Sequence, residues 1–203
     1  PGRKRFGHRR GPLGGLATTN LDDSLAPVAD SKAANAVRRL LDRGVPDPHN
    51  GLGGKVLEMA AYYHEVMAPY PKVRHYVHLY HPDMQGPMDI CELLWGSSLF
   101  VALVEAPDLV TALLELVTET YVAFMDAWTA LEPLSVAQDE TRGDTYAVHW
   151  AMLHKGEIMV RDDSAMNLSP RMFDRFIKPY DGRLLQTWGG GLHFCGRGDH
   201  YIS

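Results

Sequence analysis

Strand-like and helical segments alternate along most of this chain. Three short segments resemble buried strands because they are rich in β-branched, aromatic or small apolar residues: 73–80, 157–161 and the stretch around His193. Between them, apolar residues recur at the three- and four-residue spacing of amphipathic helices, most clearly over residues 107–131. Strand, helix, strand order is typical of parallel βαβ units. The alternation therefore predicts an α/β protein with parallel strands and with helices outside them.

The ends of several helices can be placed from capping residues and prolines. Ser31 and Ser169 stand where N-caps are expected, and Gly44 follows the first apolar stripe as a C-terminal glycine does. The predicted helices cover residues 31–43, 53–68, 88–95, 99–105, 107–131, 144–155 and a last stretch from residue 169, kinked at Pro179. Residues 1–30 have no sustained period. We interpret them as an irregular segment before one domain of residues 31–203.

Composition narrows the class of protein. The chain has 203 residues, is 45% hydrophobic and carries a formal net charge of -5, which suits one globular domain and argues against general nucleic-acid binding. No apolar run reaches the roughly 20 residues that span a bilayer, and no signal peptide is visible. Two cysteines far apart give no disulfide framework, so we expect a reducing cytoplasm. The chain starts at Pro1 and stops shortly after a glycine-rich stretch, so we expect truncation at both ends.

Polar residues follow each predicted strand at the point where it ends. Gln85 comes after the first strand, Asp162 and Asp163 come after the second, and His193 and Cys195 lie at the third. In parallel barrels the chemistry takes place at this carboxyl-terminal edge of the strands. A complete (β/α)₈ barrel needs about 250 residues, and this chain offers about four strands. The sequence therefore predicts part of a (β/α)₈ TIM barrel.

His193 and Cys195 are the candidate metal ligands. They lie two residues apart, and residues at that spacing in a strand point to the same face. Imidazole nitrogen and thiolate sulfur are both good ligands for zinc. The alternative is a core histidine beside a buried cysteine, because free cysteine is often simply buried.

Asp163 is the candidate catalytic residue. Adjacent residues on a strand point to opposite faces, so at most one of Asp162 and Asp163 faces the predicted barrel interior. Asp163 would then bind substrate, act as a general acid or base, or orient a zinc ligand. The alternative is that the two carboxylates cap the next helix.

Three further residues are candidates for substrate binding. Gln85 would present its amide to the pocket, or else fix the turn before the next helix. His149 would line the pocket. His200 lies near the same edge, where a structural role is the alternative.

An ordered set of short motifs resembles the uroporphyrinogen decarboxylase superfamily over roughly residues 40–203. The set consists of Gln85-Gly86-Pro87, Leu94-Trp95-Gly96, Ala106-Pro107-Asp108 with Leu113-Leu114, Asp163-Ser164, Leu168-Ser169-Pro170, Phe173 and Pro179. The resemblance implies a (β/α)₈ barrel. It also implies one of two chemistries, because the superfamily includes a metal-free decarboxylase of heme synthesis and corrinoid-dependent methyltransferases that carry zinc.

The zinc methyltransferases hold their metal through His-x-Cys and a later cysteine. His193-Phe194-Cys195 matches the first part of that pattern, but no cysteine follows it, so the third ligand is expected to be absent from this chain. The arginine-rich motif of the decarboxylase is not recognisable either.

The resemblance therefore implies three alternative functions. The favoured one is zinc-assisted methyl transfer between a corrinoid and a thiol or a related small acceptor, with a corrinoid protein as partner. The second is metal-free uroporphyrinogen decarboxylation in porphyrin synthesis. The third is a non-catalytic barrel that binds a corrinoid or a partner. No nucleic-acid or membrane partner is expected.

Overall fold

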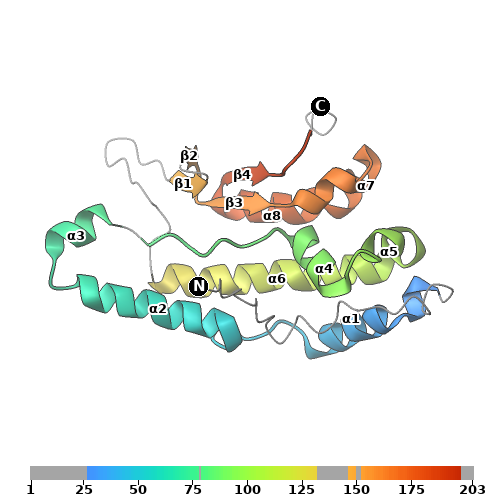
Figure 1. Cartoon of the computed structure of the whole chain (residues 1–203), viewed down its shortest axis with the longest axis horizontal. Helices are drawn as coiled ribbons and strands as arrows, with labels where there is room; N and C mark the ends of the chain where they lie inside the picture. The colour runs from blue at the N-terminus through green and yellow to red at the C-terminus, as the bar shows by residue number, and fades with distance from the viewer. Residues whose placement is uncertain (1–26, 78, 132–145, 150–151, 198–203) are drawn as a thin grey trace, which may run out of the picture.

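A computed structural model describes residues 27–77, 79–131, 146–149 and 152–197. This part of the chain forms eight α-helices and two sheets of two strands each (Figure 1). The helices are α1 (Lys32–Arg43), α2 (Gly51–Met67), α3 (Pro71–Tyr76), α4 (Pro87–Trp95), α5 (Leu99–Glu105), α6 (Pro107–Leu131), α7 (Pro170–Phe176) and α8 (Lys178–Trp188). The strands are β1 (Tyr146–His149), β2 (Met152–Lys155), β3 (Ile158–Arg161) and β4 (Gly190–His193). Two short 3-10 helices are η2 (Val28–Asp30) and η3 (Asp163–Asn167).

The long helix α6 runs through the middle of the molecule, with α1 and α2 on one side and the strands with α7 and α8 on the other (Figure 1). Its apolar residues contribute to two clusters of the core. One cluster joins α6 to α1, α4, α5, η3 and α7, and the other joins it to α2, α8 and β3. The helix therefore connects the layer that carries the strands to the layer that lies below it.

Strands β3 and β4 are parallel and are connected by η3, α7 and α8. Their register pairs Ile158 with Gly190 and Arg161 with His193. Gly190 has φ +113°, and a Cβ atom there would overlap the carbonyl of Ile158. The glycine thus permits a close approach of the two backbones that another residue would prevent.

Several local predictions are confirmed. The bounds of α5 and α6 match the predicted helices. The Oγ atoms of Ser31 and Ser169 accept hydrogen bonds from Ala34 N and Met172 N, so both serines cap helices as expected. Gly44 ends α1 with φ +71°.

The predicted fold class is wrong. The described residues contain one parallel pair, β3–β4, and one antiparallel hairpin, β1–β2, where part of a (β/α)₈ TIM barrel was expected. Helices dominate this part of the chain, and its centre is the helix α6 instead of a parallel sheet.

Two secondary-structure assignments led to this error. Residues 73–80 were expected to form a strand, but Pro71 occupies the first turn of α3 and the chain is helical to Tyr76. Residues 144–155 were expected to form a helix, but the described part forms β1 and β2, where Ala147 is buried and β1 contacts β3. Contact with β3 accompanies the strand conformation of β1. The described side chains of α3 are exposed, and the local signal for its helix is Pro71 in the first turn.

Within the described ranges, no single helix is long and apolar enough to span a membrane. Helices α4 and α5 reach that length and apolar character only as a pair, which is bent by 101°.

Candidate metal centre

The register of the parallel strands places Asp163 opposite Cys195. Arg161 and His193 are paired, and the chain continues past each strand in the same direction. The amide N–H of Asp162 donates to the carbonyl of His193 at 3.0 Å, which extends the pairing by one step. Two residues beyond each paired position, the N–H of Cys195 donates to Oδ1 of Asp163 at 2.6 Å.

His193 and Cys195 lie side by side at this point. The Nε2 atom of His193 is 3.5 Å from the Sγ atom of Cys195. In a tetrahedral zinc site, with Zn–S of about 2.3 Å and Zn–N of about 2.0 Å, these two ligand atoms lie about 3.5 Å apart. The separation of the two side chains is therefore the one that a shared zinc ion requires.

Asp163 brings a third candidate ligand to the same place. One ligand atom each from Asp163, His193 and Cys195 lies within 4.8 Å of the other two. The third ligand, which the sequence placed outside this chain, thus has a candidate within it. Sulfur, nitrogen and oxygen donors together suit zinc, and three protein ligands leave a fourth position open, as in catalytic zinc sites.

The charges at the centre also suit a cation. The Asp163 carboxylate beside Cys195 raises the pKa of its thiol above the usual value. Without a nearby cation, the thiol therefore keeps its proton at neutral pH. A divalent ion would reverse this preference, because it compensates the two negative charges and binds the thiolate.

An open cavity of about 500 Å³ lies beside the three ligands. His149 lines this cavity, and its ring packs edge-on against the ring of His193, with centroids 4.4 Å apart. His149 thereby limits the orientations open to the His193 imidazole. The cavity is large enough for a small-molecule substrate next to the open metal position.

Arg161 is a cavity residue that the sequence analysis did not single out. It is 7% exposed, and its guanidinium donates to Nδ1 of His149 at 3.0–3.2 Å and to the carbonyl of Met84 at 3.2 Å. It also pairs with Asp83, whose side chain is mostly exposed. A charged residue at the end of an otherwise apolar buried strand was the signal that could have identified it.

Tyr80 and His81 complete one wall of the cavity. Their rings stack with centroids 4.0 Å apart. The Nδ1 atom of His81 lies 2.8 Å from the carbonyl of Pro82, to which it donates as a neutral imidazole. Burial lowers the pKa of His81 to about 4, so this wall stays uncharged at neutral pH.

Asp162 lies outside the centre, as the opposite faces of a strand predict. It is fully buried, and its carboxylate accepts hydrogen bonds from the backbone N–H groups of Asp89 (2.7 Å) and Met88 (3.4 Å) at the start of α4. The capping alternative therefore holds for Asp162, although the helix it caps is α4 and not the next one in the chain. Burial and the neighbouring Asp181 raise its pKa well above the usual value.

Gln85 and Asp163 line both this cavity and a second cavity of about 630 Å³. Asp89, Glu92 and Ser164 contribute polar groups to the wall of this second cavity. Ser164 Oγ donates to Glu92 at 2.5 Å, which ties η3 to α4. Of the candidate substrate-binding residues, Gln85 and His149 thus lie beside the metal centre. His200 falls outside the described residues.

Comparison of the chain with protein-family models, curated proteins and solved structures finds no match.

Proposed function

We propose that this protein is a zinc-dependent enzyme that activates a small thiol as a methyl acceptor. The observation that carries the proposal is the convergence of Asp163, His193 and Cys195 at the edge of an open cavity, with an S–N separation of 3.5 Å. A thiol, an imidazole and a carboxylate with ligand atoms within 4.8 Å of one another form a donor set that suits zinc.

The residues at the candidate metal centre have different roles. Cys195 and Asp163 supply two negative charges for a divalent cation, and His193 supplies a neutral nitrogen. His149 holds the ring of His193, and Arg161 in turn holds His149. Zinc bound here would offer one open position and would lower the pKa of a thiol that binds there, which makes the thiol a nucleophile at neutral pH.

The methyl donor that we propose is a corrinoid, delivered by a corrinoid protein. Support comes from the ordered motifs that resemble the uroporphyrinogen decarboxylase superfamily, and from His193-Phe194-Cys195, which matches the first part of the zinc pattern of its methyltransferases. A reducing compartment such as the cytoplasm would keep Cys195 free of disulfides and available to the metal.

The experiment that tests this function uses methylcobalamin with a panel of small thiols. Loss of the methylcobalamin absorbance should depend on the thiol and on zinc-loaded protein. It should fall to the background rate after chelation and in Cys195→Ala. A rate that is indifferent to protein or to chelation contradicts the proposal. Decarboxylation of uroporphyrinogen that survives chelation would favour the metal-free alternative.

A further inference from the structure

Arg161 is the only arginine or lysine among the residues that line the two cavities beside the candidate metal centre. Its side chain is 8% exposed, so a permanent positive charge is held almost entirely out of water. A buried charge is costly unless a negative partner of matching geometry accompanies it. The groups that surround this guanidinium therefore indicate what kind of ligand the cavity can hold.

One N–H group of the Arg161 guanidinium has no acceptor within the part of the chain that the structure describes. A guanidinium carries five N–H groups. Nε and Nη2 each donate to Nδ1 of His149, at 3.2 and 3.0 Å. Nη1 donates to the carbonyl of Met84 at 3.2 Å and to the carboxylate of Asp83, with a longer contact of 3.5 Å to the carbonyl of Met159. These bonds leave the second N–H of Nη2 unused.

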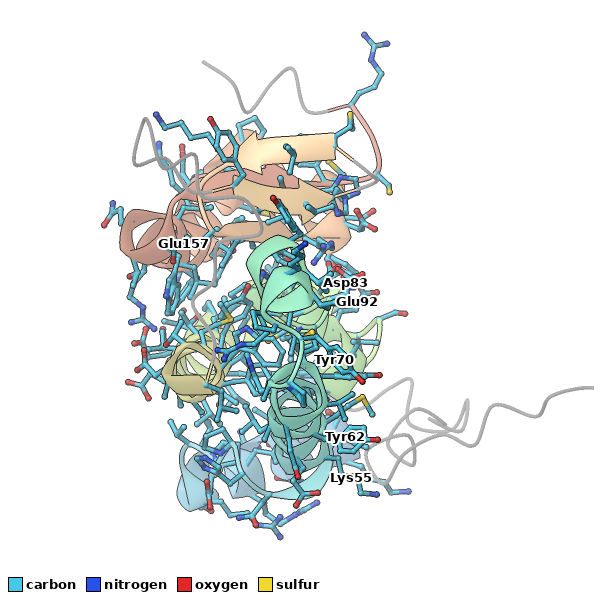
Figure 2. All side chains as sticks on the ribbon, turned by 90° about the vertical axis from the view of Figure 1, so that its left-hand side faces the viewer. Lys55, Tyr62, Tyr70, Asp83, Glu92 and Glu157 are labelled. Carbon is cyan, nitrogen blue, oxygen red and sulfur yellow. The ribbon has the colours of Figure 1, made fainter. Side chains whose placement is uncertain are left out.

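Asp83 is an incomplete partner for this charge. It contacts Arg161 through Oδ1 and Nη1, and its side chain is 70% exposed. Figure 2 shows Asp83 on the opposite side of the molecule from Glu157, the residue before β3, so Asp83 lies toward the carboxyl end of that strand, where Arg161 stands. Water competes for an exposed carboxylate, and ion pairs of this kind contribute little to stability.

The carboxylate of a ligand would complete the pairing of Arg161. The outer edge of a guanidinium presents N–H groups of Nη1 and Nη2 side by side, and this fork matches the two oxygens of a carboxylate. In Arg161, Asp83 engages Nη1 with one oxygen, and the unused N–H belongs to Nη2. A ligand that takes both positions would release Asp83 into the water that already surrounds most of its side chain.

We propose that the cavity beside the metal centre binds a small molecule through a carboxylate group, which Arg161 holds in a bidentate pair in place of Asp83. The bonds to His149 hold the guanidinium in position before the ligand arrives, which lowers the entropic cost of binding. A monocarboxylate suits the site better than phosphate, because the cavity wall has one permanent cation and also carries the carboxylates of Asp83 and Asp163. The proposal needs neither zinc nor a thiol, so it does not rest on the proposed function.

The test follows the Nε–H resonance of Arg161 by NMR during a titration with propionate. Zinc is first removed with the neutral chelator phenanthroline, so that the carboxylate cannot bind a metal ion instead. Propionate should shift the resonance in a saturable way, with a dissociation constant of about 1 mM. Propionamide, which has the same shape without the charge, should cause no saturable shift. Equal effects of the two compounds, or no effect of propionate, contradict the proposal.

Substitution of Asp83 tests whether its carboxylate occupies the place of the ligand. Asp83→Asn removes the internal competitor and should tighten propionate binding about threefold, which is the size of effect that an exposed ion pair gives. A gain of affinity cannot result from unfolding. Asp174→Asn removes another exposed ion pair, with Lys178, and is the matched control that should leave the affinity unchanged. Unchanged or weaker binding in Asp83→Asn would overturn the proposal.

Two further measurements test the fork and the class of anion. Arg161→Lys keeps the charge but loses the planar fork, so it should weaken propionate binding at least about tenfold, measured through backbone amide resonances. Those resonances also report whether the variant is folded, and the gain in Asp83→Asn decides the question if it is not. Inorganic phosphate should bind the wild type more weakly than propionate. Wild-type affinity in a folded Arg161→Lys, or tighter binding of phosphate, would contradict bidentate recognition of a carboxylate.

Discussion

Arg161 and His193 occupy paired positions on the parallel strands β3 and β4, so their side chains project from the same face. The pairing determines the whole centre, because it sets Asp163 opposite Cys195 two residues further along. It also explains why a buried guanidinium and a candidate metal ligand border one cavity. His149 connects the two, since it accepts from Arg161 and packs against the ring of His193.

His149→Ala should weaken zinc binding by about tenfold, because residues that orient a metal ligand typically contribute 10- to 100-fold to affinity. The lost contact is the edge-on packing at 4.4 Å, without which the His193 imidazole samples more orientations. Competition with a coloured zinc chelator measures the affinity. His154→Ala is the matched control, because its ring centroid lies 6.5 Å from that of His149 on the next strand. Equal affinities in wild type and His149→Ala would refute the role given to His149.

Substitution of the two neighbouring aspartates should affect different properties, the free energy of unfolding for Asp162 and zinc binding for Asp163. Asp162→Ala removes the hydrogen bonds to Met88 N and Asp89 N and should lower the free energy of unfolding by about 2 kcal/mol. Asp163→Ala changes an exposed residue and should alter stability by less than about 0.5 kcal/mol while it abolishes tight zinc binding. Urea unfolding and zinc titration of both variants check this. The same loss of stability in both variants would speak against the assignment.

The contribution of Asp181 to stability should decrease as pH rises, because its carboxyl group is buried. Burial raises the pKa of Asp181 from 3.8 to about 7, so the folded state binds a proton that the unfolded state releases. The stabilisation is complete below about pH 4 and is lost as pH rises through 7, at no more than about 1.4 kcal/mol per pH unit for one proton. Urea unfolding of the wild type and of Asp181→Asn from pH 5 to pH 8 should show this slope in the difference between their stabilities, because the opposite contribution of His81, whose pKa is lowered, cancels in that difference. A difference between the two proteins that stays constant across this range would contradict the assignment.

The sequence predicted the helices well where capping is local. Ser31, Gly44 and Ser169 mark helix ends through short-range hydrogen bonds and backbone preference, and these signals do not depend on the rest of the fold. The secondary structure predicted from the sequence was wrong where the conformation depends on pairing between strands. The apolar residues between 146 and 155 have spacings that fit a helix as well as two short strands. The strands are the conformation observed, and β1 contacts β3 in it.

The candidate centre was predictable in part. The i, i+2 spacing of His193 and Cys195 was enough to place them together, and the alternation along a strand separated Asp162 from Asp163. The approach of Asp163 to Cys195 depends on the register of β3 and β4, whose paired residues are 32 positions apart in the sequence, and no local pattern encodes that register. The overall fold was wrong for a related reason, because a strand assigned to residues 73–80 suggested more parallel pairing than the described residues have.

Zinc content measured by elemental analysis, together with binding by titration, tests the metal centre most directly. The wild type should bind about one zinc per chain, and Cys195→Ala should lose it. Cys91→Ala should keep it, because Cys91 is the other free cysteine and is buried in the core beside α1 and α6. A wild type without zinc, or a Cys195→Ala variant that retains it, would contradict the account and would leave His193 and Cys195 without a role in metal binding.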